Sequence, residues 1–497
     1  MKSKVMGFFS KGRMTKGINM IVGNKRLRFV SIAAVVIFIA CGPGDTGDLI
    51  GVQGRSPWFH PEPPGTVYVK TGTFHTGQGG QDVFQSYLQP NKQMSVLGFW
   101  MDETEITNNE YRQFVAYVID SIARMKLYED DDIKEKIVPS ADKNGGGKLV
   151  AELFKKPNPE DEDAEDYDPN APEVPFINHD EAMDWEQKEL HKLLYSEMYY
   201  QGEERFRGKR QIDVSKLKYH YQWFDLVLAA TSDKNRDKYK PQNRKDFIKD
   251  EDVLIYPDTL CWIRDFTYSF NEPMARVYFW HPRYDDYPVV GVNWAQARAF
   301  CHWRSYQKDA YWEMNDHMPN TEMFRLPTEY EWEYASRGGR IGNKYPWGGP
   351  YARNGKGCML ANFKPMRGDY GASDGGVYPV RADSYFPNDF GLYNMSGNVS
   401  EWTQTKWDEG TNSFAHDLNG NYDVYIKEHS DDAQEQAKLS KTPITQKRKV
   451  IRGGSWKDVA YFIECGARTY EYQDTSKCYI GFRCVQTYIG RSNMDKK

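Results

Sequence analysis

The chain has 497 residues, of which 39% are hydrophobic and 15% aromatic, and its formal net charge is -5. These values are typical of a globular protein with a large core, built as two or three average domains or as one decorated domain. The nearly balanced charge gives no reason to expect nucleic acid as the main partner. Because no stretch reaches the roughly 18 to 20 apolar residues of a membrane-spanning helix, we expect the mature chain not to cross a bilayer.

The N-terminus has the features of an export signal in the usual order. A basic segment at 25–28 precedes an apolar run, and a small residue then precedes Cys41. This order resembles a bacterial lipoprotein signal, with residues 1–40 removed, Cys41 lipidated and the Gly- and Pro-rich residues 41–64 forming a tether. The alternative is a simple secretory signal with an incidental cysteine, because Phe38 stands where lipoprotein signals prefer leucine.

Alternation and capping residues predict the first elements of the fold. Residues 65–74 and 98–102 have the pattern of strands, and Thr107 or Asn108 is a good N-cap for a helix at 109–122. The apolar residues that would share one face of this helix are Tyr111, Phe114, Val115 and Val118.

The character of the sequence changes over residues 128–280. An acidic block at 160–168 is expected to be a solvated segment, with an acidic docking arm as the alternative. Residues 180–200 have a helical pattern, and residues 209–249 are basic with interleaved aromatics. Four apolar residues there fall at helical spacing, which favours a core face of a helix over a base-stacking platform: Trp223, Phe224, Val227 and Leu228.

The globular pattern resumes at residue 287. Residues 288–294 are predicted to form a buried strand, followed by a helix at 295–307. The remainder, to about residue 487, is rich in Gly, Trp and Asn, which favours short strands and ordered loops. Residues 427–448 are predicted to be an exposed loop or helix.

Five segments, taken in chain order, resemble the formylglycine-generating-enzyme (sulfatase-modifying factor) family. They are MDETEITNNEY (101–111), RLPTEYEWEYA (325–335), GLYNMSGNVSEW (391–402), RGGSW (452–456) and GFRC (481–484). The resemblance implies an α+β, loop-rich, C-type-lectin-related domain with a large, partly helical insertion. The expected division of the chain is a domain over 65–127 and 281–487, an insertion over 128–280 and a tail over 488–497.

The whole arrangement is also similar to the PorK/GldK-type lipoproteins of the Bacteroidetes type IX secretion and gliding machinery. This resemblance rests on the signal, the domain and an insertion that ends in YSFNEP (268–273) before the 288–292 segment. It implies self-association into a ring, a periplasmic partner of the PorN/GldN type, and lipid attachment to the outer membrane facing the periplasm.

Active members of the formylglycine-generating family hold copper with a pair of cysteines shortly after the Gly-Gly-Ser segment. A soft thiolate pair is the ligand set that selects Cu(I). Here the first thiolate position is Asp458, and no cysteine occurs between that segment and Cys465. We therefore expect a protein that binds no copper and is not an enzyme, because side chains alone do not activate dioxygen.

The resemblance also implies calcium sites and a disulfide. The residues that match the two calcium sites are Asn394, Gly397, Val399 and Glu401 for the first, and Asn362, Phe363, Asp374 and Gly376 for the second. Oxygen donors on loops suit structural Ca²⁺, and the alternative is that the carboxylates only accept hydrogen bonds from backbone amides. Cys301 and Cys484 match a family disulfide, whereas Cys465 lacks its usual partner because Ala335 stands there. Three alternatives stay open for Cys465: a disulfide with Cys478, a disulfide with Cys358, or a buried free thiol.

We expect exposed aromatic and arginine residues to bind the partner, because these residue types are common interface anchors. The predicted interface residues are Tyr268, Phe270, Arg276, Tyr278 and Trp280. The alternative for these five is packing of the insertion against the domain. The leading hypothesis is thus a non-catalytic structural subunit, and the others are a glycan- or peptidoglycan-binding lectin-like lipoprotein and a copper-dependent cysteine oxidase.

Overall fold

A computed structural model describes residues 60–77, 89–129, 154–155, 176–177, 194–231, 244–316, 321–370, 376–427, 439 and 441–490. All of these residues belong to one unit. The predicted signal peptide, Cys41, residues 41–59 of the predicted tether and the acidic block lie outside the described residues. Residues 60–64 of the predicted tether are described, and there the prediction is wrong for His60, because its side chain is buried against the domain. Within them, no helix is both long enough and apolar enough to cross a membrane.

Strands from the two ends of the described chain share one sheet. Strand β1 (Thr66–Val69) and strand β13 (Val485–Thr487) both pair with β4 (Phe99–Asp102), antiparallel in each case. The predicted strands at 65–74 and 98–102 are thus confirmed, although β2 (Gly72–Thr76) already begins a separate hairpin with β3 (Lys92–Val96). At the edge of the sheet, His60 Nδ1 accepts a hydrogen bond from the Ile489 backbone N–H at 3.2 Å.

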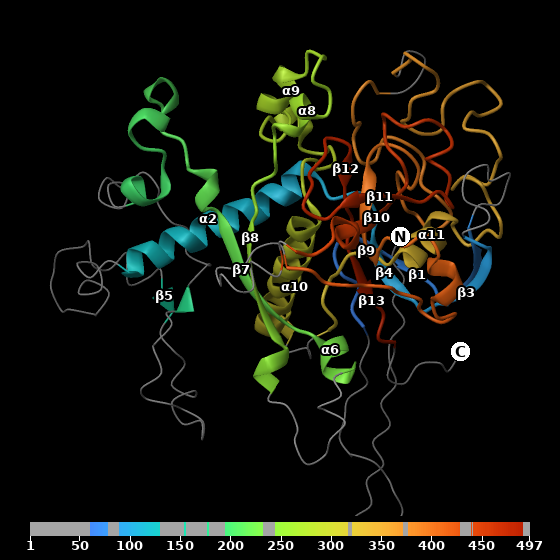
Figure 1. The fold of residues 1–497 in the computed structure, drawn as a ribbon, viewed down its shortest axis with the longest axis horizontal. Helices are drawn as coiled ribbons and strands as arrows, with labels where there is room; N and C mark the ends of the chain where they lie inside the picture. Colours follow the sequence, from blue (N-terminus) through green and yellow to red (C-terminus); the bar gives the residue numbers. More distant parts are fainter. Residues whose placement is uncertain are drawn as a thin grey trace, which may run out of the picture. The chain divides into compact units, whose positions relative to one another are not determined.

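A second sheet contains the ends of three of the family-like segments, those at 391–402, 452–456 and 481–484. Its order is β11-β10-β9-β12, formed by Thr469–Tyr472, Arg448–Arg452, Ser400–Lys406 and Ile480–Gly481. Strand β12 runs parallel to β9, and the other pairs are antiparallel. Figure 1 shows the blue strands β1 and β4 next to the orange and red strands β9 to β13, so both ends of the described chain contribute to this part of the fold. Short strands and ordered loops in the C-terminal part are what its Gly-rich composition predicts.

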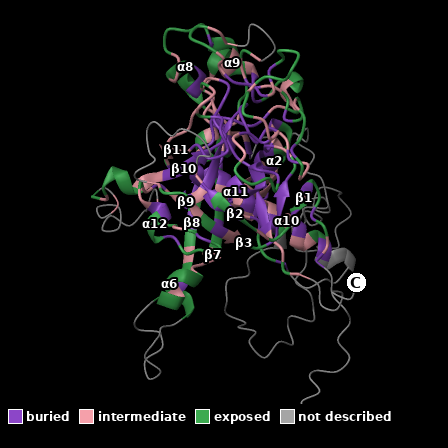
Figure 2. Ribbon diagram, turned by 90° about the vertical axis from the view of Figure 1, so that its right-hand side faces the viewer, coloured by how far each residue is buried: buried purple, intermediate pink, exposed green. Residues whose placement is uncertain are grey.

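The long helices bury the faces that the sequence predicts. Helix α2 (Asn108–Glu129) includes the predicted helix and extends seven residues past its predicted end at Ile122. The four residues predicted to share a face, Tyr111, Phe114, Val115 and Val118, are all buried. Helix α10 (Trp294–Asp316) likewise includes the predicted 295–307 helix. Buried residues concentrate around these helices and the sheets (Figure 2).

The predicted strand at 288–294 is wrong, although most of its residues are buried as expected. Only Pro288 forms a bridge, to Thr107. The backbone of Gly291 has φ of +77°, which an extended strand does not allow, and its N–H and C=O bond to Lys477 and Asp258 instead. The segment is therefore a buried, irregular connection that is hydrogen-bonded to Lys477 on one side and to Asp258 on the other.

The predicted helical core face at 223–228 is also wrong. Trp223 and Phe224 end strand β7 (Lys218–Phe224), which pairs in a hairpin with β8 (Ile248–Leu254), and Val227 is 72% exposed on the short helix α6 (Leu226–Thr231). Tyr219, Tyr221 and Trp223 alternate with polar residues along β7 and therefore share one face of the strand. This face packs against the core that contains α10. This alternation is the stronger signal, because it extends over the whole strand.

The remaining elements are short. They are β5 (Phe154–Lys155) paired with β6 (Phe176–Ile177), α8 (Cys261–Arg264), α9 (Glu272–Val277), α11 (Glu329–Ser336) and α12 (Thr411–Phe414). The described residues also form 3-10 turns at Gly202–Glu204, Phe206–Gly208, Val214–Lys216, Arg244–Phe247, Pro282–Tyr284 and Ile444–Lys447. Of the predicted helix at 180–200, residues 194–198 are helical and 180–193 lie outside the described residues. Most described residues of the predicted exposed segment at 427–448 are exposed or intermediate.

Glu331 fixes the start of α11. Its side chain accepts from the Thr328 backbone N–H at 2.8 Å, and Arg325 donates to both of its oxygens. Burial would raise the pKa of Glu331, but the Arg325 charge and the hydrogen bonds outweigh it and hold the pKa below the ordinary 4.5.

We expect this ion pair to make stability depend on pH in the acid range. Because the folded-state pKa is lowered, the unfolded chain binds a proton first, so the stabilisation is present above about pH 4.5 and is lost as pH falls through the folded pKa. Urea unfolding is measured between pH 7 and 3. The free energy of unfolding should fall less with decreasing pH for Glu331→Gln than for the parent chain. The exposed Glu203→Gln variant is the control, and a Glu331→Gln curve parallel to the parent curve would contradict the assignment.

Candidate functional site

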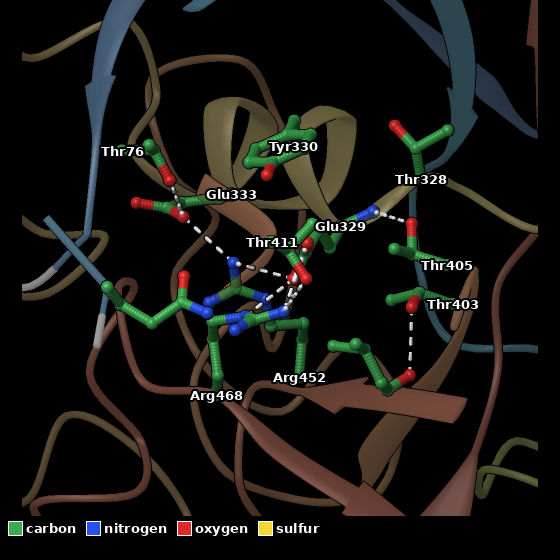
Figure 3. A network of polar contacts seen from close by, with 12 residues as sticks. Thr76, Thr328, Glu329, Tyr330, Glu333, Thr403, Thr405, Thr411, Arg452 and Arg468 are labelled. Carbon is green, nitrogen blue, oxygen red and sulfur yellow. Dashed lines mark hydrogen bonds and ion pairs between the residues drawn. The ribbon is translucent and has the colours of Figure 1, made fainter. Parts of the chain in front are cut away.

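A buried ion network holds the segment where the family has its catalytic cysteines. Arg452, the last residue of β10, donates to Glu333 of α11 at 2.8 Å, and both side chains are inaccessible to solvent. Arg468 donates to both oxygens of Glu329, at 2.6 and 3.1 Å, and Thr76 donates to Glu333 at 2.8 Å. Figure 3 shows these side chains converging between α11 and β10. Helix α11 is thereby tied directly to the strand that leads into Gly453 and Gly454.

The charges in this network compensate each other. Burial would raise the pKa of Glu333, but Arg337 and Arg452 outweigh it and hold the pKa below its ordinary value. Arg337 also donates to the carbonyl of Asn343 at 2.7 Å, so its guanidinium binds both Glu333 and a backbone carbonyl. Glu333 is thus ionised and paired, which suits a structural role and not that of a general base near neutral pH.

Two glycines turn the chain sharply after β10. Gly454 has φ of +64°, and a Cβ there would lie 2.6 Å from the Phe462 carbonyl oxygen. Gly453 has φ of +88°, with a Cβ position 3.1 Å from Trp332. Both positions therefore require glycine. The turn that they form places the following Ser455 in the buried interior.

Asp458, at the expected position of the first copper-binding thiolate, closes this turn. Its Oδ2 accepts from the backbone N–H and the hydroxyl of Ser455 at 3.0 and 2.6 Å, and its Oδ1 accepts from Lys457 Nζ at 2.7 Å. Cys465, the next sulfur, is fully buried, and burial raises the pKa of its thiol to about 11. A protonated thiol is a poor ligand, so this loop offers no thiolate pair for a soft metal.

The first calcium set lies on the buried loop before β9. The Asn394 side-chain N–H₂ donates to Glu105 Oε2 at 3.0 Å, whereas its Oδ1 has no hydrogen-bond partner among the described residues. Such a buried oxygen is costly unless a cation or water satisfies it, so Asn394 fits a Ca²⁺ ligand. Glu401 fits less well, because its oxygens already accept from Arg483 at 2.6 Å and Trp332 at 2.7 Å. Gly397 and Val399 are both buried and lie between these two residues.

The second calcium set meets the first. Asn362 Nδ2 donates to the Tyr378 carbonyl at 3.0 Å, and its Oδ1 has no partner in the described part of the chain. The Asn398 N–H donates to the Asn362 carbonyl at 2.8 Å, which joins the two loops. Phe363 is buried next to Asn362 and a Cβ on Gly376 would lie 3.5 Å from Asn362 Nδ2, whereas Asp374 lies outside the described residues.

Glu105 is the residue of this region that sequence reasoning missed. It is fully buried and accepts from Asn394 and from Asn398 Nδ2, each at 3.0 Å. Burial raises its pKa to about 8, against the opposing effect of Arg483. The acidic residue lies inside the quoted 101–111 segment, but acidic residues are seldom buried, so nothing in the local pattern indicates its position.

Cys301 and Cys484 face each other in the core, as their resemblance to a disulfide pair implies. Their sulfurs are 3.4 Å apart, as separate thiols, whereas a disulfide bond is about 2.05 Å long. Cys465 is likewise a thiol, and Cys358 is exposed. The Cys301–Cys484 bond stays a prediction, with both sulfurs positioned for it.

The predicted interface residues separate into two groups. Tyr268 is fully exposed and Phe270 is 85% exposed, in a turn between α8 and α9 that we call the aromatic turn, residues 266–270. Arg276 is exposed and pairs with Glu272, and Trp280 is half exposed and donates to the Tyr256 hydroxyl. Tyr278 does not belong to the surface, because it is buried and its hydroxyl donates to the Pro288 carbonyl at 2.6 Å. For Tyr278 the packing alternative holds.

Comparisons with known proteins agree with these motifs. The family model for the sulfatase-modifying factor enzyme 1-like domain matches residues 56–196 and 229–488. The formylglycine-generating enzyme of Bos taurus is 31% identical over 41% of this chain and 45% of the enzyme. The inactive C-alpha-formylglycine-generating enzyme 2 of Bos taurus is 32% identical over 40% of this chain and 50% of that protein. Among solved structures, PvdO from Pseudomonas aeruginosa aligns with 87% of this chain and 100% of that chain, at 14% identity and a TM-score of 0.41.

The relatives therefore include formylglycine-generating enzymes and proteins named as inactive. This chain spans about half the length of the curated relatives that it matches. The described structure is mixed α/β, with small sheets, few long helices and long ordered loops. Because the family model matches well over half of its residues, this chain belongs to the sulfatase-modifying factor enzyme 1-like domain family.

Proposed function

We propose that this protein is a non-catalytic structural subunit of a periplasmic ring of the type IX protein secretion system, anchored to the outer membrane through Cys41. The observation that carries the non-catalytic part is the role of Asp458. Its carboxylate accepts hydrogen bonds from Ser455 and Lys457 at the position where an enzyme of this family needs a thiolate. The family domain then supplies a rigid scaffold for binding, since a fold can keep its shape after losing its chemistry.

Copper binding and oxygen consumption test this part of the proposal. The purified full chain, titrated with Cu(I) against a competing chelator, is expected to take up no tightly bound copper and to consume no oxygen with a cysteine-containing peptide. A formylglycine-generating enzyme assayed in parallel is the positive control. Stoichiometric Cu(I) binding with peptide-dependent oxygen consumption would overturn the proposal and favour the oxidase hypothesis.

The aromatic turn is the surface that we assign to a neighbouring subunit. Tyr268 and Phe270 expose large apolar side chains, which are costly in water and typical of binding sites when they lie together. The base of the turn is bonded to the loop that holds Tyr378, because Asn271 Oδ1 accepts from the Tyr378 hydroxyl at 2.6 Å. The partner on this surface is then a periplasmic protein of the PorN/GldN type or another copy of the chain in the ring.

Calcium is proposed as a structural ion of the loops that hold Asn362 and Asn394. The unpartnered side-chain oxygens of these two buried residues support the proposal. If the folded chain alone binds the ion, stability rises with free calcium, by about 2.7 kcal/mol when calcium is at 100 times its Kd. Thermal unfolding in EGTA should therefore occur at lower temperature than in millimolar Ca²⁺, and Asn394→Ala should shrink this difference. Identical melting curves of the parent chain with and without calcium would contradict the proposal that calcium is a structural ion.

A glycan-binding function is the second candidate, favoured by a different surface. Two adjoining cavities of 450 and 290 Å³ share Asn354 and Met359 among their lining residues. Tyr351, 75% exposed, lines one of them, and Phe386, 92% exposed, lines the other. Exposed aromatic rings at the edge of such cavities suit stacking on the apolar faces of sugars. Pull-down with purified sacculi would support this function if Tyr351→Ser and Phe386→Ser abolished retention, and absence of retention by the parent chain would remove it.

A further inference from the structure

Two buried cysteines with no assigned partner flank the base of the aromatic turn. Cys261 begins α8 and is 1% exposed, and Cys478 precedes β12 and is fully buried. Both belong to one apolar cluster with Trp262, Tyr278 and Trp456. Two segments more than two hundred residues apart in sequence thus bring their thiols into the same small part of the interior.

Gly291 connects the two segments through its backbone. Its carbonyl accepts from Asp258 N–H at 2.7 Å, and its own N–H donates to the Lys477 carbonyl at 3.0 Å. A Cβ on Gly291 would lie 3.1 Å from the Cys261 sulfur. One residue therefore lies against the sulfur of Cys261 and is hydrogen-bonded to the residue directly before Cys478.

Asp265 connects the same two segments from a second direction. Its backbone N–H donates to the Cys261 carbonyl at 2.9 Å, and its carboxylate accepts from the Cys478 N–H at 2.8 Å. Lys477 Nζ donates to the same carboxylate at 3.3 Å. With Gly291 and Asp265 both bridging the segments, hydrogen bonds from two directions hold the two cysteines near each other.

The other described cysteines do not compete for these two thiols. Cys301 and Cys484 lie 3.4 Å from each other, and Cys358 is exposed in a turn where its backbone N–H donates to Asn354 Oδ1. Cys465 bonds through its backbone N–H to the Lys344 carbonyl at 2.9 Å, beside another core cluster.

We infer that Cys261 and Cys478 form a structural disulfide that fixes the aromatic turn to the family domain. The bond forms between the two sulfurs as both thiols lose a proton and together give two electrons to a disulfide oxidant, which is reduced to two thiols. The inference rests on the proposed function, because an exported compartment supplies such an oxidant. Burial raises the pKa of both thiols, and the thiolate is the reacting form, so the bond is made while the chain folds.

Disulfide mapping of the refolded full chain tests the inference without relying on its cellular location. The denatured, reduced chain is refolded in a buffer of reduced and oxidised glutathione, alkylated and digested, and the linked peptides are identified by mass spectrometry. We expect a Cys261–Cys478 cross-link and alkylated Cys358. Recovery of Cys261 and Cys478 as alkylated thiols, or linked to other cysteines, while Cys301 and Cys484 are joined, would overturn the inference.

Matched variants separate this bond from the fold and from the export proposal. Cys478→Ser should leave Cys261 as an alkylated thiol, whereas Cys358→Ser should keep the cross-link. Mapping of the parent chain decides the matter even if Cys478→Ser does not fold. Protein isolated from cells under trapping conditions then reports on the compartment: a chain that forms the bond in glutathione but is fully reduced in cells supports the cysteine pair and contradicts export.

Discussion

Arg452→Met is expected to lower the free energy of unfolding by about 3–5 kcal/mol, the cost of breaking a buried ion pair on one side. The substitution leaves Glu333 and Glu329 buried with one compensating charge fewer. Methionine keeps much of the side-chain volume, so the loss reports the charge and its hydrogen bonds and not a cavity. Urea denaturation followed by tryptophan fluorescence measures it.

Two controls make this measurement specific. Arg340→Met removes an exposed ion pair with Asp389 and should leave the unfolding midpoint unchanged. The single variant Glu333→Gln should also lose stability, because Arg337 and Arg452 both pair with Glu333 and would each lose a buried partner. Equal stability of Arg452→Met and the parent chain would show that the network does not contribute as the contacts indicate.

Replacing both Tyr268 and Phe270 by serine is expected to weaken partner binding on the order of 100-fold or more. Removing an interface hot spot costs at least about 2 kcal/mol, and every 1.4 kcal/mol is tenfold in affinity. Because both side chains are exposed, the thermal unfolding of the isolated chain should not change. Co-purification from envelopes, followed by titration with the isolated partner, measures the effect.

The matched control for this experiment is Tyr351→Ser with Phe386→Ser, which removes two exposed aromatic residues from a different surface. That variant should retain the partner. If the control loses binding and the Tyr268 and Phe270 variant keeps it, the contact belongs to the groove at Tyr351 and the assignment of the aromatic turn is wrong.

The fold could be predicted where one periodicity extends over a whole element. The face of α2 is an example, because Tyr111, Phe114, Val115 and Val118 repeat with helical spacing and all four are buried. The β7 strand shows the opposite case, since Trp223 and Phe224 satisfy helical spacing locally while the wider alternation around Tyr221 decides the structure. Residues 288–294 could not be read correctly, because an apolar run does not reveal that Gly291 adopts a positive φ.

The candidate site follows the sequence only in part. The sequence alone shows that residue 458 is not a cysteine. The contacts of Asp458 with Ser455 and Lys457, however, depend on the turn made by two glycines. The burial of Glu105 depends on Asn394 and Asn398, which are nearly three hundred residues later in the chain. Long-range polar contacts of this kind have no periodic signature, so single-sequence reasoning does not find them.

The sheet β1-β4-β13 has a practical consequence for protein engineering. Since β1 and β13 flank the same strand and His60 bonds to Ile489, the described chain starts and finishes at neighbouring points. A short linker from 490 to 60 should therefore permit circular permutation, with new ends opened at the exposed turn that contains Gly355 and Gly357. Deleting either terminal strand would instead remove one side of β4, so any shortened version has to keep both.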